Sequence, residues 1–174
     1  MAKKKIITYG DNKLWKPSEQ IKNIDHRINR LIQDMFDTLN DHKGIGLAAI
    51  QIGIPKRIIV IDTSTVDQDD FNIKKPLKIA IINPEITETS EREEIKDEGC
   101  LSVPGISAPV KRYFTICIKG WTIEEKEIKL KLFDLNARVA QHEIDHINGC
   151  LFVEKIDKEI YKNIEDDLRR LKIK

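Results

Sequence analysis

A chain of 174 residues with 40% hydrophobic and 34% charged residues has the size and composition of one globular domain with a buried core. Thirty basic against 29 acidic residues leave a net charge of +1, which gives no electrostatic reason to expect nucleic acid or an anionic membrane as a partner. No apolar run approaches the roughly 20 residues that a membrane span needs, and three widely spaced cysteines do not make a disulfide framework.

The N-terminus lacks the apolar segment of a secretion signal. A reducing, cytoplasmic setting is therefore expected. An organelle stays open, because a transit peptide that had been removed would leave no trace in the sequence.

The elements follow from hydrophobic periodicity, taken in chain order. Residues 24–39 have the apolar spacing of a helix with one buried stripe, which ends at Gly44. Residues 57–63 and 77–84 are β-branched runs bounded by turn residues and predict strands. The polar stretch 64–76 between them predicts a loop.

Residues 86–96 are typical of a charged strand with a turn. Apolar and polar residues alternate over 110–118, which predicts one strand, and they alternate again over 126–133. The segment 120–125 is expected to connect the last two strands as a hairpin. One face of the strand over 110–118 is predicted to carry Val110, Phe114, Ile116 and Ile118.

Two helices are predicted after the strands. The first runs from about Leu135 to Ile147, with Asp134 as its cap and Gly149 after its end. The second begins near Lys158. These elements indicate a single α+β domain over residues 1–174, with mostly antiparallel strands around a central helix and a helix towards each end.

The stretch QHEIDH, residues 141–146, carries the pattern H-E-x-x-H. Residues four apart share a helix face, so His142 and His146 can direct their imidazoles at one point. Glu143 then supplies a proton acceptor for a water molecule beside the same metal ion. The alternative is a helix whose histidines are surface polar groups.

A catalytic metal site typically has three protein ligands and one open position. Two candidates for the third ligand remain from the residue types alone. A carboxylate of the last helix, Glu165 or Asp166, would make a gluzincin-type metallopeptidase. The thiolate of Cys100, in the stretch DEGCLSVPG, would instead make a Cys-His-His site.

Three stretches together resemble the peptide deformylase family: GIGLAAIQIG (44–53), EGCLS (98–102) and QHEIDH (141–146). Their order and approximate separation match the family as well. The resemblance covers most of the chain and implies Cys100, His142 and His146 as metal ligands. It also implies removal of the formyl group from nascent peptides that begin with formyl-methionine.

Cysteine and histidine ligands accept Zn2+, Fe2+, Co2+ or Ni2+, so residue types do not choose the ion. The resemblance implies Fe2+ as the native ion, with Zn2+, Ni2+ or Co2+ able to occupy the site. Glu143 would act as general base and then general acid. Gln51 and the backbone N–H of Leu101 match family positions that stabilise the oxyanion.

Glycine lets the main chain approach a ligand closely, which suits Gly44 and Gly46 to a substrate-binding segment. The resemblance implies that this segment pairs with the bound peptide in the manner of a strand. It implies further that the apolar pocket for methionine is lined by Ile45, Leu135, Val139 and the ring carbons of His142.

The sequence also departs from the family pattern. Asn136 stands where many members have an apolar residue, which predicts a wetter pocket, and Ser107 stands where some have an arginine near the cleft. Arg112 matches a family arginine, and we hypothesise that it pairs with Glu98 and steadies the loop of Cys100.

Two alternative functions remain to be weighed against the deformylase. One is the gluzincin described above, and the other is a non-catalytic module stabilised by a metal ion with four protein ligands. The resemblance leaves room for transient contact with a ribosome, for which the end of the chain offers modest positive charge. No nucleic-acid site and no membrane contact are expected.

Overall fold

The structure, a computed structural model, describes residues 3–65 and 76–172. The described residues form two antiparallel sheets and three α-helices, which confirms the α+β class expected from the sequence. In chain order the elements are η1 (Asn12–Trp15), α1 (His26–Asp41), β1 (Gly46–Ala48), η2 (Ala49–Ile52), β2 (Ile58–Asp62), η3 (Thr63–Thr65), β3 (Lys78–Thr89), β4 (Glu93–Cys100), β5 (Val103–Tyr113), β6 (Thr115–Trp121), β7 (Glu127–Phe133), α2 (Asp134–Ile147), η4 (Phe152–Glu154) and α3 (Lys158–Lys172).

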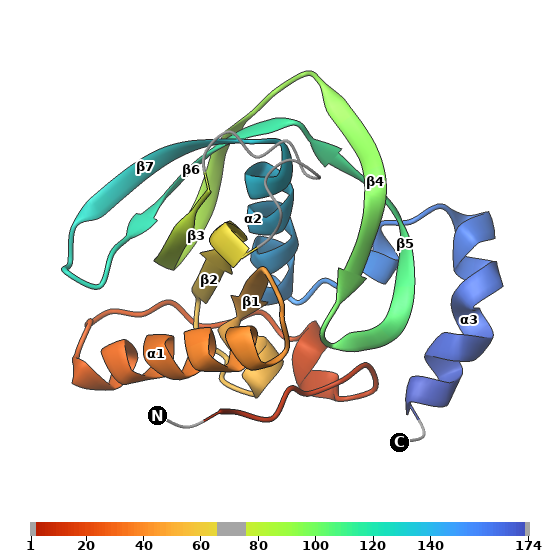
Figure 1. Cartoon of the computed structure of the whole chain (residues 1–174), viewed down its shortest axis with the longest axis horizontal. Helices are drawn as coiled ribbons and strands as arrows, with labels where there is room; N and C mark the ends of the chain where they lie inside the picture. The colour runs from red at the N-terminus through yellow and green to blue at the C-terminus, as the bar shows by residue number, and fades with distance from the viewer. Residues whose placement is uncertain (1–2, 66–75, 173–174) are drawn as a thin grey trace.

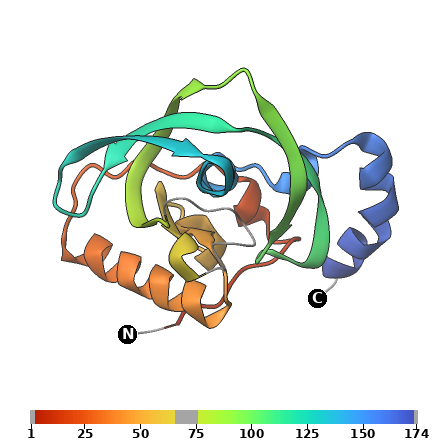
Figure 2. The same cartoon turned by 45° about the horizontal axis from the view of Figure 1, so that its top comes forward.

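The two sheets enclose α2. One sheet has five strands in the order β1-β2-β3-β6-β7, and the other is the hairpin of β4 and β5. In Figure 1 α2 stands between the two sheets, and in Figure 2 the same helix is seen along its axis with strands around it. The helix that carries H-E-x-x-H is therefore central, as the sequence predicted.

The first helix packs across β1 and β2. Asp25 caps it by accepting hydrogen bonds from the N–H groups of Arg27 and Ile28. At the other end the Gly44 N–H donates to the Leu39 carbonyl at 3.0 Å. A Cβ at position 44 would lie 2.7 Å from a Leu39 methyl carbon, so a larger residue here would have to displace that buried side chain.

The start of α2 differs from the prediction. Its cap position is Phe133, and Asp134 is the first helical residue, with φ +46°. The Asp134 N–H donates to the Phe114 carbonyl at 2.8 Å, and its carboxylate contacts Lys96 Nζ at 2.6 Å. Asp134 does not cap the helix because β7 runs directly into α2 and its carboxylate pairs with β4 instead. Gly149 follows the helix end with φ +78°, as predicted.

The prediction of one strand over residues 110–118 is wrong. The chain changes direction at Phe114, so β5 belongs to the hairpin and β6 to the five-stranded sheet. Val110 is buried in a different cluster from Ile116 and Ile118. In contrast, β3 (Lys78–Thr89) joins most of the predicted strand 77–84 to the start of the charged stretch, and the turn of that stretch lies between β3 and β4. Most of the predicted loop over 64–76 lies outside the described residues.

The last helix lies outside the β4–β5 hairpin, as Figures 1 and 2 both show. Leu168 is its one fully buried side chain, and it belongs to a cluster that includes Val103, Val110 and Phe152. Half-buried apolar residues support the same contact: Ile160, Ile164 and Leu171. The predicted apolar stripe of this helix therefore faces the hairpin and lies on the far side of it from α2.

Candidate metal centre

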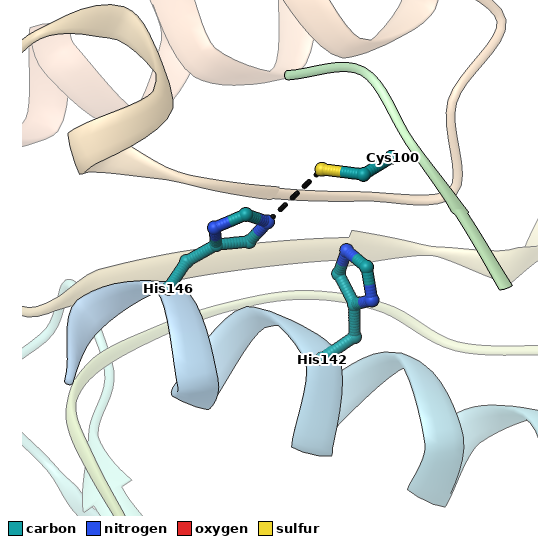
Figure 3. Close-up of side chains that lie close together, drawn as sticks. All are labelled: Cys100, His142 and His146. Carbon is teal, nitrogen blue, oxygen red and sulfur yellow. Dashed lines mark hydrogen bonds between the residues drawn. The ribbon is translucent and has the colours of Figure 1, made fainter. Parts of the chain in front are cut away.

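Three candidate ligand atoms come together between β4 and α2. The Sγ of Cys100 lies 3.2 Å from Nε2 of His146, and one ligand atom from each of Cys100, His142 and His146 lies within 4.8 Å of the others. Figure 3 shows both rings rising from α2 towards the sulfur, which enters from the opposite side. The spacing of four residues on α2 therefore directs both imidazole rings at one point, as the pattern H-E-x-x-H predicted.

Cys100 reaches this position because its strand ends there. The regular pairing of β4 with β5 is shifted between Gly99 and Cys100, and Cys100 then pairs with Val103 across a two-residue turn. The N–H of Ser102 in that turn donates to the Cys100 sulfur at 3.4 Å. The turn thus aims the thiol at the histidine helix and away from its own strand.

The residues fit a divalent metal ion. Ligand atoms about 2.0–2.3 Å from a tetrahedral ion lie roughly 3.3–3.6 Å from one another. The separations here begin at 3.2 Å and stay within 4.8 Å, so small rotations of the side chains close the gap. Within the part of the chain that the structure describes, these three residues form the one His, Cys, Asp or Glu group that could hold a metal ion.

The second nitrogen of His142 is held by a buried carboxylate. Nδ1 of His142 lies 2.9 Å from Oε2 of Glu98, which directs Nε2 at the sulfur. Such a carboxylate orients the ring and increases the basicity of the ligand nitrogen. The pair links the first residue of the EGCLS stretch to the first histidine of the helix.

Glu98 is itself held by two guanidinium groups. Arg112 donates from Nε and Nη2 to its two oxygens at 2.9 Å each, and Arg138 Nη1 donates to Oε1 at 2.7 Å. Burial alone would raise the pKa of Glu98, but the contacts with Arg112 and His142 lower it to about 2. The pair of Arg112 and Glu98 hypothesised from the sequence is therefore present, and its carboxylate stays ionised.

The network continues to the end of the metal helix. The third donor of Arg112, Nη1, contacts a carboxylate oxygen of Asp145, and Lys155 Nζ lies 3.0 Å from the other. Asp145 directly precedes His146 on α2, and its side chain is 14% exposed. These two contacts give Asp145 a structural role at the end of α2.

Arg138 is a member of the site that sequence reasoning missed. Besides Glu98, it donates to the backbone carbonyls of Val110 and Glu94 at 2.9 and 2.8 Å, so it ties α2 to both strands of the hairpin. A signal existed: Arg138 lies four residues before His142 and therefore on the same buried helix face. Its side chain also lines the cleft.

Glu143 is buried beside the ligands with an unused oxygen. The residue is 3% exposed, and Oε2 has no hydrogen-bond partner among the described residues. Burial raises the pKa of Glu143 to about 7. A Cβ added to Gly46 would lie 2.5 Å from Oε1, so the strand edge passes this carboxylate as closely as glycine permits.

Gln51 directs its amide at the thiol. Its Oε1 accepts the Ala48 N–H at 2.7 Å, which places Nε2 on the other side, 3.4 Å from the Cys100 sulfur. The side chain is fully buried, contrary to what an ordinary surface amide would show. Leu101, whose backbone N–H was the second predicted donor, follows Cys100 in the turn and lines the cleft.

A cleft of about 880 Å³ opens over these residues. It is lined by every residue predicted to contact substrate: Gly44, Ile45, Gly46, Leu135 and Val139. Asn136 is absent from the lining, because it accepts a hydrogen bond from Thr63 Oγ1 at 2.8 Å. The wetter pocket predicted from Asn136 is therefore not supported by the position of that residue. Ser107 does line the cleft.

The carboxylates proposed for a gluzincin lie elsewhere. Glu165 and Asp166 are on α3, outside the hairpin, and their side chains are 41% and 85% exposed. Glu165 pairs with Arg169 at 3.0 Å. A site that uses either residue is not favoured by this arrangement. A four-ligand structural site is not favoured either, since three ligand atoms and an open cleft are found together.

Comparison with known proteins agrees with these observations. The family profile described as polypeptide deformylase matches residues 3–161. A peptide deformylase of Brachyspira hyodysenteriae is 40% identical over 169 residues, which cover 97% of this chain and 89% of the relative. One from Thermodesulfovibrio yellowstonii is 43% identical over 156 residues and 90% of each protein.

Solved structures give the same result. A peptide deformylase from Legionella pneumophila superposes with a TM-score of 0.86 at 36% identity, covering 98% of this chain and 96% of the other. One from Ehrlichia chaffeensis, solved in complex with actinonin, superposes with a TM-score of 0.88 at 33% identity over 98% of both chains. None of the described helices is both long and apolar enough to cross a bilayer.

Proposed function

Because this chain belongs to the polypeptide deformylase family, we propose that its cleft performs the family's reaction with Cys100, His142 and His146 as metal ligands and Glu143 as general base. The enzyme is a deformylase: it hydrolyses the formamide bond at the N-terminus of newly made peptides that begin with formyl-methionine, and it releases formate. The observation that carries the proposed roles is the meeting of one sulfur and two imidazoles beside a buried, unpartnered carboxylate.

Cys100, His142 and His146 would hold the metal ion with one soft and two borderline ligands. Such an ion would lower the pKa of a water molecule and polarise the formyl carbonyl. The chain's contribution is to hold the ligands in place: His142 by its contact with Glu98, and Cys100 by the turn that follows β4. The cleft leaves one side of the ligand group open to substrate.

Glu143 moves the proton. Its Oε2 has no hydrogen-bond partner in the described part of the chain, so it can accept a proton from the attacking water. Without a cation beside it, burial raises the pKa of Glu143 to about 7, which favours uptake of a proton that the group then returns to the departing amine. The formyl carbon is then released as formate and the methionine amine as the new N-terminus.

Gln51 and Leu101 receive the negative charge that develops on the formyl oxygen. Ala48 anchors the oxygen end of the Gln51 carboxamide, which sets Nε2 on the side of the Cys100 sulfur before substrate arrives. Donors that are fixed beforehand stabilise an oxyanion without a reorganisation cost during the reaction. The backbone N–H of Leu101 is the second donor, next to the ligand Cys100.

The peptide main chain pairs with β1. This strand is at the edge of its sheet. The Asp62 N–H donates to the Ile45 carbonyl at 2.9 Å, so the alternation of an antiparallel ladder turns the N–H and carbonyl of Gly46 away from β2. Gly46 lines the cleft, so an extended peptide that lies along this edge forms hydrogen bonds with the N–H and carbonyl of Gly46. Gly44 continues the same edge.

The methionine side chain enters the apolar part of the cleft. Leu135 and Val139 lie on the face of α2 that also carries His142, and Ile45 contributes from the segment before β1. The guanidinium of Arg138 is bound to backbone carbonyls and to Glu98, which leaves its carbon chain to line this pocket. A flexible apolar side chain of moderate length fits such a wall.

Three finer assignments complete the proposal. Fe2+ is the native ion, as the family resemblance implies, and the Cys-His-His ligand set accepts Zn2+, Ni2+ or Co2+ in its place. The enzyme acts in the cytoplasm, where formylated chains are made. Contact with the ribosome is transient, since two basic residues at the end of α3, Arg169 and Arg170, already pair within the helix.

The test is formate release from a formyl-methionyl peptide by protein loaded anaerobically with Fe2+. Turnover is expected with the formylated peptide, and none with the same peptide carrying an acetyl group or a free amine. Release of an internal amino acid or cleavage of a peptide bond would instead support a metallopeptidase. Absence of turnover in protein with one metal ion per chain would overturn the proposal.

A further inference from the structure

The hydroxyl of Ser102 is a buried polar group that none of the roles above uses. Ser102 is 0% exposed, and it lies two residues after the ligand Cys100. Its Oγ lies 3.4 Å from Nε2 of Gln51, which itself lies 3.4 Å from the Cys100 sulfur. Cysteine sulfur, serine hydroxyl and glutamine amide therefore meet at one point behind the ligand turn.

The Gln51 carboxamide needs a second fixed point. Its oxygen is held by the Ala48 N–H at 2.7 Å, but a single contact leaves the plane of the amide free to swing. The nitrogen has two hydrogens. Two acceptors lie beside them at 3.4 Å each, the Cys100 sulfur on the cleft side and Ser102 Oγ behind it. The hydrogen on the sulfur side can turn to the formyl oxygen while an acceptor at the back of the site holds the other. Ser102 Oγ offers that acceptor.

The backbone of Ser102 is itself held on both sides. Its carbonyl accepts the Tyr9 N–H at 2.7 Å, and its own N–H donates to the Cys100 sulfur at 3.4 Å. A hydroxyl on a fixed backbone positions a neighbouring group more closely than one on a mobile loop does. The N-terminal segment, through Tyr9, thereby supports the back of the site.

We propose that Ser102 is a positioning residue, whose hydroxyl holds one N–H of Gln51 so that the other points into the cleft. The inference rests on the proposed role of Gln51 in stabilising the oxyanion. Removing an oxyanion donor lowers kcat by about 100- to 1,000-fold. Releasing a donor that stays nearby costs less, so Ser102→Ala is expected to lower kcat about 10-fold with KM changed less than about 2-fold.

Ser18→Ala is a matched control. Ser18 is also a buried serine, 7% exposed, and its Oγ has no hydrogen-bond partner among the described residues. Both variants replace a buried hydroxyl with hydrogen, so loss of volume affects them alike. Ser18→Ala is expected to keep the wild-type kcat.

The decisive measurement is the side-chain amide resonance of Gln51 in zinc-loaded, 15N-labelled protein, assigned by its loss in Gln51→Glu. In Ser102→Ala we expect these resonances to shift and their hydrogens to exchange faster, with one metal ion per chain retained. Ser18→Ala should leave them in place. Ser102→Thr, which keeps the hydroxyl, should hold kcat within about 3-fold of wild type if one hydrogen bond is what matters.

Unchanged Gln51 resonances and kcat in Ser102→Ala would overturn the proposal and make Ser102 a filler of the turn. Loss of metal in that variant would also overturn it, since Ser102 would then act through Cys100. A Thr variant as impaired as the Ala variant would count against the hydroxyl. If wild-type protein released no formate, the proposed function would fail, yet the Gln51 resonances would still decide whether Ser102 holds the amide.

Discussion

The two helices of the C-terminal half, α2 and α3, place their charged residues in opposite environments. Ten of the 14 residues of α2 are buried, among them Arg138 and Glu143, whereas Leu168 is the one buried residue in the 15 of α3. On α3 the charged side chains pair along the surface, as Glu165 does with Arg169. On α2, Arg138 has its partners on β4 and β5, whereas Glu143 Oε2 has no hydrogen-bond partner among the described residues and burial raises the pKa of that group. The comparison teaches that a substitution on α2 acts on a network or on the site, and one on α3 acts on a surface pair.

Loss of the sulfur ligand should have the largest effect. Cys100→Ser replaces a thiolate with a hydroxyl that stays protonated at neutral pH, so metal affinity is expected to fall by more than the roughly 100-fold typical of residues behind the ligands. Metal content and formate release measure this. Cys150→Ser, which alters a cysteine away from the ligand group, serves as control. Full metal occupancy in Cys100→Ser would remove the sulfur from the site.

Glu143→Ala should separate turnover from metal binding. Because Glu143 is not one of the three ligands, metal content should stay at one ion per chain while kcat falls by about 100- to 10,000-fold. Removing a buried carboxylate whose Oε2 has no partner should not destabilise the fold. Retained turnover would show that another group moves the proton.

Arg112→Ala should destabilise the protein without touching a ligand. The substitution removes one of the two guanidinium groups that face the Glu98 carboxylate, which is 6% exposed. Breaking such a buried ion pair lowers the free energy of unfolding by about 3–5 kcal/mol. Metal affinity should also fall, by roughly 10- to 100-fold, because Glu98 orients His142. Urea unfolding and metal titration measure the two effects. An Arg112→Ala protein with unaltered stability and metal content would show that the network does not steady the site.

Substitutions on α3 should have the smallest effect. Glu165→Gln and Asp166→Asn alter side chains that are 41% and 85% exposed, so the free energy of unfolding should change by no more than about 0.5 kcal/mol. Metal content and kcat should match the wild type. A marked loss of metal in either variant would revive the gluzincin alternative and erase the contrast between the two helices.

Much of the fold was predictable where local pattern and tertiary structure agree. The three α-helices and the strands β2 and β7 lie close to the residues expected from periodicity. The break between β5 and β6 was not predictable, because the chain turns at Phe114 without a glycine or proline. Even-numbered residues stay inward on both sides of the corner, so Val110 and Ile116 continue one alternation although they face different clusters.

The site shows the same division between what a local pattern predicts and what depends on tertiary structure. Helical spacing and the three motifs predicted which residues would gather around the metal ion. The partners behind them depend on how β4, β5 and α2 approach one another, which no local pattern records. Arg138 stands in a helix, and its acceptors lie on both strands of the hairpin. Asp134 failed as a cap for a related reason, since the distant Lys96 binds its carboxylate.

The carboxylate of Glu98, held from two sides by Arg112 and Arg138, has a consequence for how the protein handles its ion. The pose of His142 is set by charges that belong to the polypeptide, so assembling the centre does not depend on which cation arrives. Chelation should therefore yield a folded apoprotein, and one batch of it should accept different cations in turn without refolding. Availability in the cell, and not the fold, would then decide which cation the enzyme carries.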